Sequence, residues 1–437
     1  MSGDARATPV PQGRLPRLLR MGGLTSGVLG SAVAAGIGQV ARGQRPSLAG
    51  AFLTPSVAAR LARDLGQMRG AAMKLGQMLS MDPGLVLPPE MTALLSALRA
   101  DAPPMPPKQL QRVLDAEWGA GWYGRFARFD VRPFAAASIG QVHRAVTKDG
   151  RALAVKVQYP GVRASIDSDL ANIETIFRLP GLLPRGMDLA PMLAEARRQL
   201  HQEADYQTEA RNLTAFRTLL AGDGRYLLPE VAAEISTPQV LAMTYLDSQP
   251  IDALVAAPQE ARDRVAAALI DLCLHELFTF GRMQTDPNLA NYRYCPASGR
   301  VVLLDFGAVM PIGPGMRDDF RALLRAALGD DPGATRAALL GIGYFDAKTA
   351  PEHQDLIQRM FVTAMGPLRQ AAPFDFGTSP LLETLRDMGM AMAMDRDLSH
   401  VPPPATMFLH RKIGGIYLLA TKLRARIALR PMVERFC

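Results

Sequence analysis

The chain has 437 residues, and 48% of them are hydrophobic, which is enough for a large core and excludes a disordered or fibrous protein. Its three cysteines lie far apart without CxxC spacing, so a disulfide scaffold and a structural zinc site are also excluded. The net charge of +8 suggests a nucleic-acid partner, but only 6% of the residues are aromatic, which disfavours a protein that stacks on bases.

The basic residues are concentrated at the two ends of the chain. Residues 1–50 hold six arginines against one acidic residue, residues 411–435 sum to +6, and the remainder sums to −3. A slightly acidic body argues against nucleic acid as a partner. The uncharged stretch 22–41 has about the 20 residues that a helix needs to cross a bilayer, but polar residues interrupt it. A membrane-associated segment, a true span and a soluble arm all remain open, and an anionic membrane surface is the partner that the N-terminal arginines favour.

A helical extension follows this basic arm. Thr54-Pro55 is typical of a helix start, and apolar residues at three- and four-residue spacing predict an amphipathic helix over 55–80. Shorter helical patterns occur near 90–99 and 107–118.

Strand patterns begin near residue 129. The runs SIGQVHRAV and RALAVKVQY are joined by a hairpin turn signal at 148–150. Helical patterns cover 162–178 and 188–221, and the strand-like runs AAEIS and VLAMTYL precede Asp247.

The last part of the chain is mostly helical. A long helix is predicted over 257–280, then an irregular loop QTDPNLAN and a hairpin ending in VVLLDFG; everything after 314 reads as helices. This order predicts an α+β protein with the two lobes of a kinase, a helical extension in front and a predominantly helical C-lobe. The expected divisions are a basic arm with an apolar segment, the helical extension, the N-lobe with an inserted helix, and the C-lobe, at 1–50, 51–128, 129–248 and 249–437.

Lysine is scarce, with 7 Lys against 42 Arg, so a lysine within a motif indicates chemistry that needs a compact ammonium group. This directs attention to Lys74 and to Lys156 on the strand-like run AVKVQY. Phosphoryl transfer requires such a lysine, a helix carboxylate that holds it, an Asp and an Asn on one loop, and an Asp that binds magnesium. The chain offers these residue types in that order at Lys156, Glu203, Asp205, Glu209, Asp286, Asn291 and Asp305.

Three features of conventional protein kinases are missing. No GxGxxG precedes Lys156, where the chain reads PFAAASIGQV; no His-Arg precedes Asp286; and no APE follows Asp305. A conventional Ser/Thr/Tyr protein kinase is therefore not expected.

The segments AAMKLGQMLS, PFAAASIGQVH, AVKVQYPGV, EADYQTE, MQTDPNLANY, LLDFGA and FLHRKIGGIYLL together resemble the UbiB/AarF family of atypical kinases, and in particular its coenzyme Q-associated members. The resemblance covers residues from about 50 to 430. It implies a regulatory KxGQ motif at Lys74, Gly76 and Gln77, on a helix that folds over the pocket where a protein substrate would bind. The matching ExD pair is Glu203 and Asp205, which are expected to meet that motif and to neutralise a buried Lys74.

The resemblance also implies the nucleotide site. Ala135, Ala136, Ala137 and Ser138 match an Ala-rich loop that replaces the glycine-rich loop over the phosphates of ATP. Lys156 then binds the nucleotide with Glu209 as its partner, although the sequence alone leaves open whether Glu203 or Glu209 holds it. Asp286 matches the catalytic Asp, and Asn291 and Asp305 match the Mg²⁺ ligands.

The function that follows is an ATP- and Mg²⁺-dependent atypical kinase or ATPase that supports ubiquinone biosynthesis at a membrane. The expected acceptor is a lipid or isoprenoid-phenol small molecule, and ubiquinone-biosynthesis enzymes and a second copy of the chain are further candidate partners. The expected location is the cytoplasmic side of a bacterial-type membrane or the matrix side of an inner membrane. The alternative is a catalytically weak nucleotide-binding scaffold, a pseudokinase that organises a biosynthetic complex.

Overall fold

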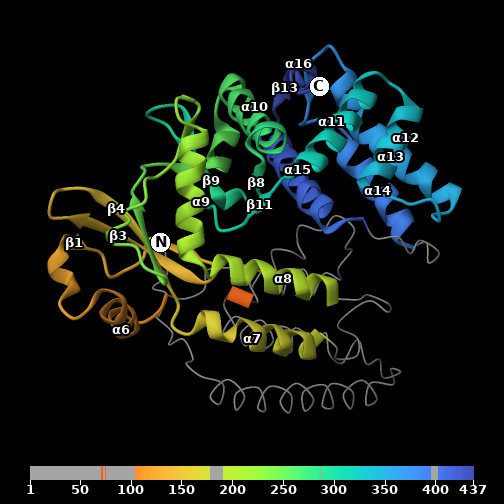
Figure 1. Cartoon of the computed structure of the whole chain (residues 1–437). Coiled ribbons are helices and arrows are strands. Elements are labelled where there is room, and N and C mark those ends of the chain that lie inside the picture. The colour runs from red at the N-terminus through yellow and green to blue at the C-terminus, as the bar shows by residue number, and fades with distance from the viewer. Residues whose placement is uncertain (1–69, 72–73, 75–103, 178–189, 287, 395–401) are drawn as a thin grey trace, which may run out of the picture. The chain divides into compact units, whose positions relative to one another are not determined.

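The computed structural model describes residues 70–71, 74, 104–177, 190–286, 288–394 and 402–437 (Figure 1). The basic arm, most of the helix expected over 55–80 and the helix expected near 90–99 lie outside these residues. The chain divides into two compact units, which are Met1–Arg211 with Glu230–Tyr245 and Asn212–Pro229 with Leu246–Cys437.

The first unit is built on an antiparallel sheet with the strand order β1-β3-β4-β6, in which β2 also pairs with β3. Its strands are β1 (Phe126–Phe129), β2 (Ala135–Ala137), β3 (Gly140–Thr147), β4 (Ala152–Gln158) and β6 (Val240–Thr244). The chain reverses between β3 and β4 at Gly150, whose φ of +87° suits a residue without a side chain. The hairpin predicted at 148–150 is therefore confirmed.

One face of this sheet packs against helix α6 (Pro107–Trp118), as the helical pattern over 107–118 predicted. Leu153, Val155 and Val157 of β4 alternate along the strand and are fully buried in that core. The period of two places Lys156 on the opposite face of the sheet.

Three helices complete the first part of the chain, α7 (Val162–Phe177), α8 (Ala190–Glu203) and α9 (Tyr206–Leu219), of which α7 and α8 lie alongside each other (Figure 1). The pattern predicted over 188–221 is thus two helices. The strand predicted for AAEIS is wrong: the segment forms a turn closed by hydrogen bonds from the N–H groups of Ile235 and Ser236 to the carbonyl of Ala232. Its apolar residues Ala232 and Ile235 are buried three positions apart, a spacing that a strand does not produce.

The second unit contains a sheet with the order β5-β10-β9-β7 and a pairing of β8 with β11. These strands are β5 (Tyr226–Leu227), β7 (Gln249–Pro250), β8 (Arg282–Gln284), β9 (Tyr292–Cys295), β10 (Arg300–Leu303) and β11 (Val309–Pro311). The helix predicted over 257–280 is α10 (Gln259–His275), and it continues as a π-helical turn η4 (Glu276–Phe280).

Helices dominate the remainder, as predicted from residue 314 onwards. They are α11 (Pro314–Leu328), α12 (Pro332–Ile342), α13 (Pro351–Arg369), α14 (Leu381–Met394), α15 (Pro404–Lys422) and α16 (Leu429–Glu434). The exception is β12 (Phe374–Asp375), which pairs with β13 (Arg426–Ile427). Strands of two residues are too short to leave a periodic signal.

The buried His143 on β3 makes the stability of the first unit depend on pH. Its Nδ1 lies 2.8 Å from the carbonyl of Asp130, and the Nε2 of Gln141 lies 2.9 Å from its Nε2. Gln141 can only donate through this nitrogen, because its oxygen already accepts from the N–H of Met105, so the neutral imidazole fits both contacts. Burial lowers the pKa of His143 to about 4 and outweighs the contact with Asp130.

We therefore expect the unfolding free energy to fall as the pH is lowered from 6.5 towards 4. In this range the histidine binds a proton in the unfolded chain but stays mostly neutral in the folded one. At pH 5 the loss from His143 alone is about 2 kcal/mol. Urea unfolding at pH 7.5 and pH 5 measures the effect. The His143→Gln variant should lose this part of the pH dependence while keeping the part due to His410, whose pKa burial also lowers to about 4. An unchanged pH dependence in the variant would contradict the assignment.

Candidate active site

Lys156 and Glu209 form an ion pair inside the first unit. The Nζ of Lys156 donates to Oε1 of Glu209 at 2.6 Å, and the carboxylate side chain is only 3% exposed. Lys156 comes from β4 and Glu209 from the first turn of α9, while the ring of Tyr206 lies 5.4 Å from the ammonium group. Of the two carboxylates left open by the sequence, Glu209 is the one that contacts Lys156.

The Ala-rich segment is a strand rather than an open loop. Ala135 to Ala137 pair in register with Val142, Gln141 and Gly140, so Ser138 and Ile139 form the turn of a tight hairpin. Gly70 of the helical extension packs directly on this turn, because a side-chain carbon added there would lie 2.9 Å from Ile139 and 3.0 Å from the carbonyl of Ser138. The close approach of Gly70 to the turn at Ser138 and Ile139 is therefore possible because Gly70 has no side chain.

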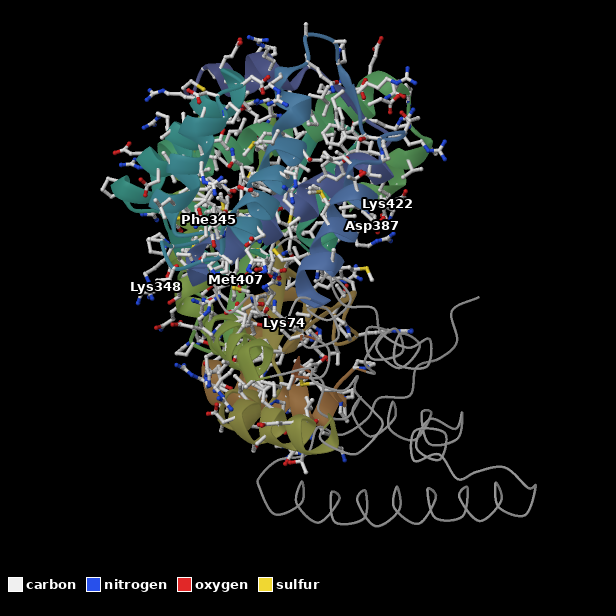
Figure 2. The ribbon with its side chains drawn as sticks, turned by 90° about the vertical axis from the view of Figure 1, so that its right-hand side faces the viewer. Lys74, Phe345, Lys348, Asp387, Met407 and Lys422 are labelled. Atoms are coloured by element: carbon white, nitrogen blue, oxygen red, sulfur yellow. The ribbon has the colours of Figure 1, made fainter. Side chains whose placement is uncertain are left out.

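Glu203 links the extension to the same hairpin. Its Oε1 accepts from the Nζ of Lys74 and its Oε2 accepts from the hydroxyl of Ser138. Lys74, labelled in Figure 2, is only 1% exposed, and this carboxylate helps to compensate its buried charge. Gly76 and Gln77 of the expected KxGQ motif lie outside the described residues.

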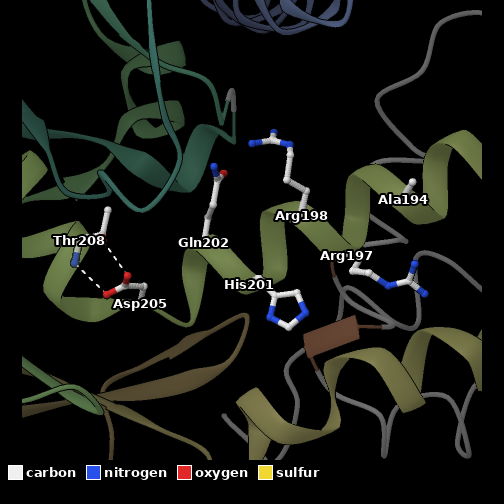
Figure 3. A pocket seen from close by; sticks show the side chains of 7 residues that line it. All are labelled: Ala194, Arg197, Arg198, His201, Gln202, Asp205 and Thr208. Atoms are coloured by element: carbon white, nitrogen blue, oxygen red, sulfur yellow. Dashed lines mark hydrogen bonds between the residues drawn. The ribbon is translucent and has the colours of Figure 1, made fainter.

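Asp205, the second carboxylate of the expected ExD pair, lies at the start of α9. Its two carboxylate oxygens accept from the N–H of Thr208 at 3.0 Å and from the hydroxyl of Thr208 at 2.7 Å (Figure 3). Asp205 is therefore the N-cap of α9, and it ends the helical run that the sequence predicted to be continuous. Although burial opposes ionisation, these hydrogen bonds and the nearby Arg211 lower the pKa of Asp205.

Asp286 and Asn291 lie in the second unit, on the loop between β8 and β9. The carbonyl of Asp286 accepts from Nε2 of Gln284 at 2.8 Å and from Nδ2 of Asn291 at 3.2 Å. Its carboxylate accepts from the N–H of Asn288 at 3.3 Å. Because Asn291 donates through its amide nitrogen, its amide oxygen is the atom that it can offer to a hard cation.

Asp305 follows β10 and opens the DFG tripeptide. Its Oδ1 accepts from the N–H of Gly307 at 3.0 Å. The carbonyl of Phe306 accepts from Nδ2 of Asn212 at 3.0 Å, and its ring packs 4.7 Å from that of Phe216. The segment is thus anchored to the second half of α9.

The ligands available in this unit fit magnesium held together with a nucleotide. The backbone of Asn291 accepts from the N–H of Leu304 at 3.2 Å, which ties the loop to the residue before Asp305. Magnesium in kinase sites uses one or two protein oxygen ligands and completes its shell with phosphate oxygens and water. Across the described parts of the chain, no group of three or more His, Cys, Asp or Glu side chains forms a candidate metal cage.

Two residues near the loop of Asp286 and Asn291 are not among those that the sequence predicted. Gln284 contacts Asp286 directly, and Lys412 of α15 donates to Oε1 of Gln284 at 3.1 Å. The scarcity of lysine is the signal that points to Lys412, which lies in the segment FLHRKIGGIYLL.

An open hollow of about 510 Å³ lies along α8 and the start of α9 (Figure 3). Its lining includes Arg197, Arg198, His201, Gln202, Asp205 and Thr208. Arg197 pairs with Asp167 at 3.0 Å and Arg198 with Glu195 at 2.8 Å. These two arginines are therefore already balanced by carboxylates, that of Asp167 on α7 and that of Glu195 on α8 itself.

The comparisons with known proteins agree with this arrangement. The ABC1 atypical kinase-like domain model matches residues 97–337. "Atypical kinase COQ8, mitochondrial" of Saccharomyces cerevisiae is 37% identical over 425 residues, which cover 97% of this chain and 84% of that protein. "Atypical kinase COQ8B, mitochondrial" of Rattus norvegicus is 35% identical over 444 residues, covering 99% and 82%. The chain belongs to the ABC1 atypical kinase family.

A solved structure that resembles this chain is that of Rv3197 of Mycobacterium tuberculosis in complex with erythromycin. It has a TM-score of 0.60 and 27% identity, and the match covers 88% of this chain and 97% of that one. Membership of the ABC1 atypical kinase family confirms the resemblance to UbiB/AarF kinases, the α+β two-lobe kinase-like fold and the kinase class of this chain.

Proposed function

We propose that this ABC1 atypical kinase binds ATP with Mg²⁺ and transfers the γ-phosphoryl group to a small non-protein acceptor or to water. The observation that carries the proposal is the buried ion pair of Lys156 with Glu209, since phosphoryl-transfer enzymes hold a phosphate-binding lysine in this way. The hairpin of Ala135 to Ser138 would cover the phosphates.

In the second unit, Asn291 and Asp305 would hold Mg²⁺, and Asp286 would accept the proton of the attacking hydroxyl group. The bound metal would neutralise charge that develops on the transferred phosphoryl group. The residues of the chain orient the acceptor and hold the proton, which is why the loop contacts of Asp286 matter for the reaction.

The proposed setting is a membrane, where the enzyme supports ubiquinone biosynthesis and acts on a lipid or isoprenoid-phenol. The relatives named COQ8 and their mitochondrial names support this setting. The contacts of Gly70 and Lys74 with the hairpin and with Glu203 support a small acceptor, because the family resemblance implies that this segment covers the place where a protein substrate would bind. Among the residues that the structure describes, no helix is long and apolar enough to cross a bilayer, and the apolar segment 22–41 lies outside them.

The test is ATP turnover by the full chain, with and without Mg²⁺, anionic vesicles and a phenolic quinone-precursor mimic. We expect turnover that requires Mg²⁺, that is lost in Asp305→Asn, and that rises with vesicles and with the phenol. Deleting residues 1–50 should remove the vesicle effect, which high salt should also weaken. ATP binding without turnover would favour the scaffold, and turnover that Asp305→Asn leaves unchanged would refute the site.

A further inference from the structure

The catalytic loop lacks the residues that precede the catalytic Asp in conventional kinases. Gln284 and Thr285 stand before Asp286, in place of the His-Arg of the usual motif. Thr285 joins the loop to the residue before β11 through its N–H, which donates to the carbonyl of Ala308 at 2.9 Å. Gln284 is buried, and its amide nitrogen donates to the carbonyl of Asp286 at 2.8 Å. A glutamine amide thus holds the main chain of the catalytic residue.

The other end of that amide is held by a buried lysine from a distant part of the sequence. The Nζ of Lys412 donates to Oε1 of Gln284 at 3.1 Å and to the hydroxyl of Tyr292 at 3.1 Å. It also forms an ion pair with Oε2 of Glu276 at 3.0 Å, and the two side chains are 1% and 0% exposed. An ammonium group has three N–H donors, and the hydrogen bonds to Gln284 and Tyr292 use two of them.

The side chain of Glu276 holds the backbone of the same glutamine. Glu276 opens the π-helical turn η4, and its Oε1 lies 3.3 Å from the N–H of Gln284, which donates to it. Burial would lower the pKa of Lys412, but the charge of Glu276 and the contact with Tyr292 raise it, so the lysine is protonated at neutral pH. Gln284 is therefore held at its main chain by Glu276 and at its side chain by Lys412.

Burying an ion pair costs free energy, because both charges lose their hydration. Its presence here therefore suggests that its geometry has a use. Here the carbonyl oxygen and the amide nitrogen of Gln284 lie in one plane, so an ammonium group that fixes the oxygen also directs the nitrogen. We propose that Lys412 is a positioning residue, which with Glu276 orients Gln284 and through it Asp286. The catalytic meaning of this network rests on the proposed function, whereas its effect on loop order does not.

Two variants test the network without leaving a buried charge unpaired. Gln284→Leu removes the amide that contacts Asp286, and Lys412→Met combined with Glu276→Gln removes both charges together. We expect either change to lower kcat for ATP turnover by about 10- to 100-fold, because small displacements of a catalytic group have effects of this size. The KM for ATP should stay within about twofold, since the network touches none of the residues proposed to cover the nucleotide.

A readout independent of activity is hydrogen exchange of the loop amides. The N–H groups of Ala290 and Asn291 donate to Asn288 within the loop, so they should exchange about tenfold faster when Asp286 is no longer held. The matched control is Lys422→Met with Asp252→Asn, which removes an ion pair of the same 3.0 Å length from the same helix at an exposed position (Figure 2). The control should change neither kcat nor loop exchange.

The outcomes separate this inference from the proposed function. If the unmodified enzyme shows no Mg²⁺-dependent turnover, the proposed function fails, and loop exchange still decides whether Lys412 positions Asp286. Unchanged loop exchange, or normal kcat in both variants beside an inactive Asp286→Asn enzyme, would overturn the role of Lys412. If Lys412 acts through Asp286, adding its variant to Asp286→Asn should cause little further loss, and a full additional loss would overturn that route.

Discussion

Changing Asp286 to Asn is expected to lower kcat for ATP turnover by about 10² to 10⁴-fold while leaving ATP affinity nearly unchanged. The substitution removes the carboxylate that would accept the proton of the attacking hydroxyl, and general-base catalysis contributes factors of this size. Asn keeps the shape of the residue, and the hydrogen bonds from Gln284 and Asn291 go to its backbone carbonyl, so the loop should remain in place. Steady-state turnover and calorimetric ATP binding measure the two quantities.

The control for this experiment is Asp319→Asn, the same chemical change at an exposed position on α11. It should leave turnover and ATP binding unaltered. Turnover by Asp286→Asn within about twofold of the unmodified enzyme would remove Asp286 from the mechanism. A parallel loss of ATP affinity would show instead that the substitution disturbed the loop or the metal ligands.

The second large effect is expected at the link between the extension and the hairpin. Glu203→Gln removes the carboxylate that pairs with the buried Lys74, and breaking one side of a buried ion pair costs about 3–5 kcal/mol. The hydroxyl of Ser138 loses a charged acceptor at the same time. We expect the segment that carries Gly70 and Lys74 to detach from the hairpin, which faster hydrogen exchange and easier proteolysis near residue 74 would report.

Removing both charges tests the electrostatic cause. Lys74→Met combined with Glu203→Gln should recover most of the lost stability, because no unpaired charge remains buried. Asp205→Ala is the matched comparison from the same ExD pair, and as the loss of a helix N-cap it should cost only about 1 kcal/mol. A loss in Glu203→Gln no larger than that of Asp205→Ala would contradict the proposed link.

Local patterns predicted most of the framework of the site. The alternation along β4 placed Lys156 opposite the apolar core, and the turn signal at Gly150 predicted the hairpin that carries it. The same local reasoning failed for AAEIS. Its composition resembles that of a strand, but its buried residues are three positions apart and the segment forms a turn. Local reasoning also merged α8 and α9, because the capping role of Asp205 is visible only in its contacts with Thr208.

The scarcity of lysine proved to be a useful signal. Lys74, Lys156 and Lys412 each form an ion pair with a buried or nearly buried glutamate. The exposed Lys422 pairs instead at the surface with Asp252. Three of the seven lysines of this arginine-rich chain therefore lie in such pairs, where the cation is a compact ammonium group.

The sequence by itself determined the order of the motifs, the kinase-like fold class and the residue types available for phosphoryl transfer. Tertiary structure alone decided which carboxylate meets which lysine, because Glu203 and Glu209 belong to two helices whose relative direction depends on the break at Asp205. It also decided what the basic C-terminus does. Five of its seven cations form ion pairs within the second unit, between Lys412 and Glu276, Lys422 and Asp252, Arg426 and Asp375, Arg430 and Glu434, and Arg435 and Asp271. A sum of charges along the chain contains no information on such pairs, since their partners are mostly far apart in sequence and meet only when the chain folds.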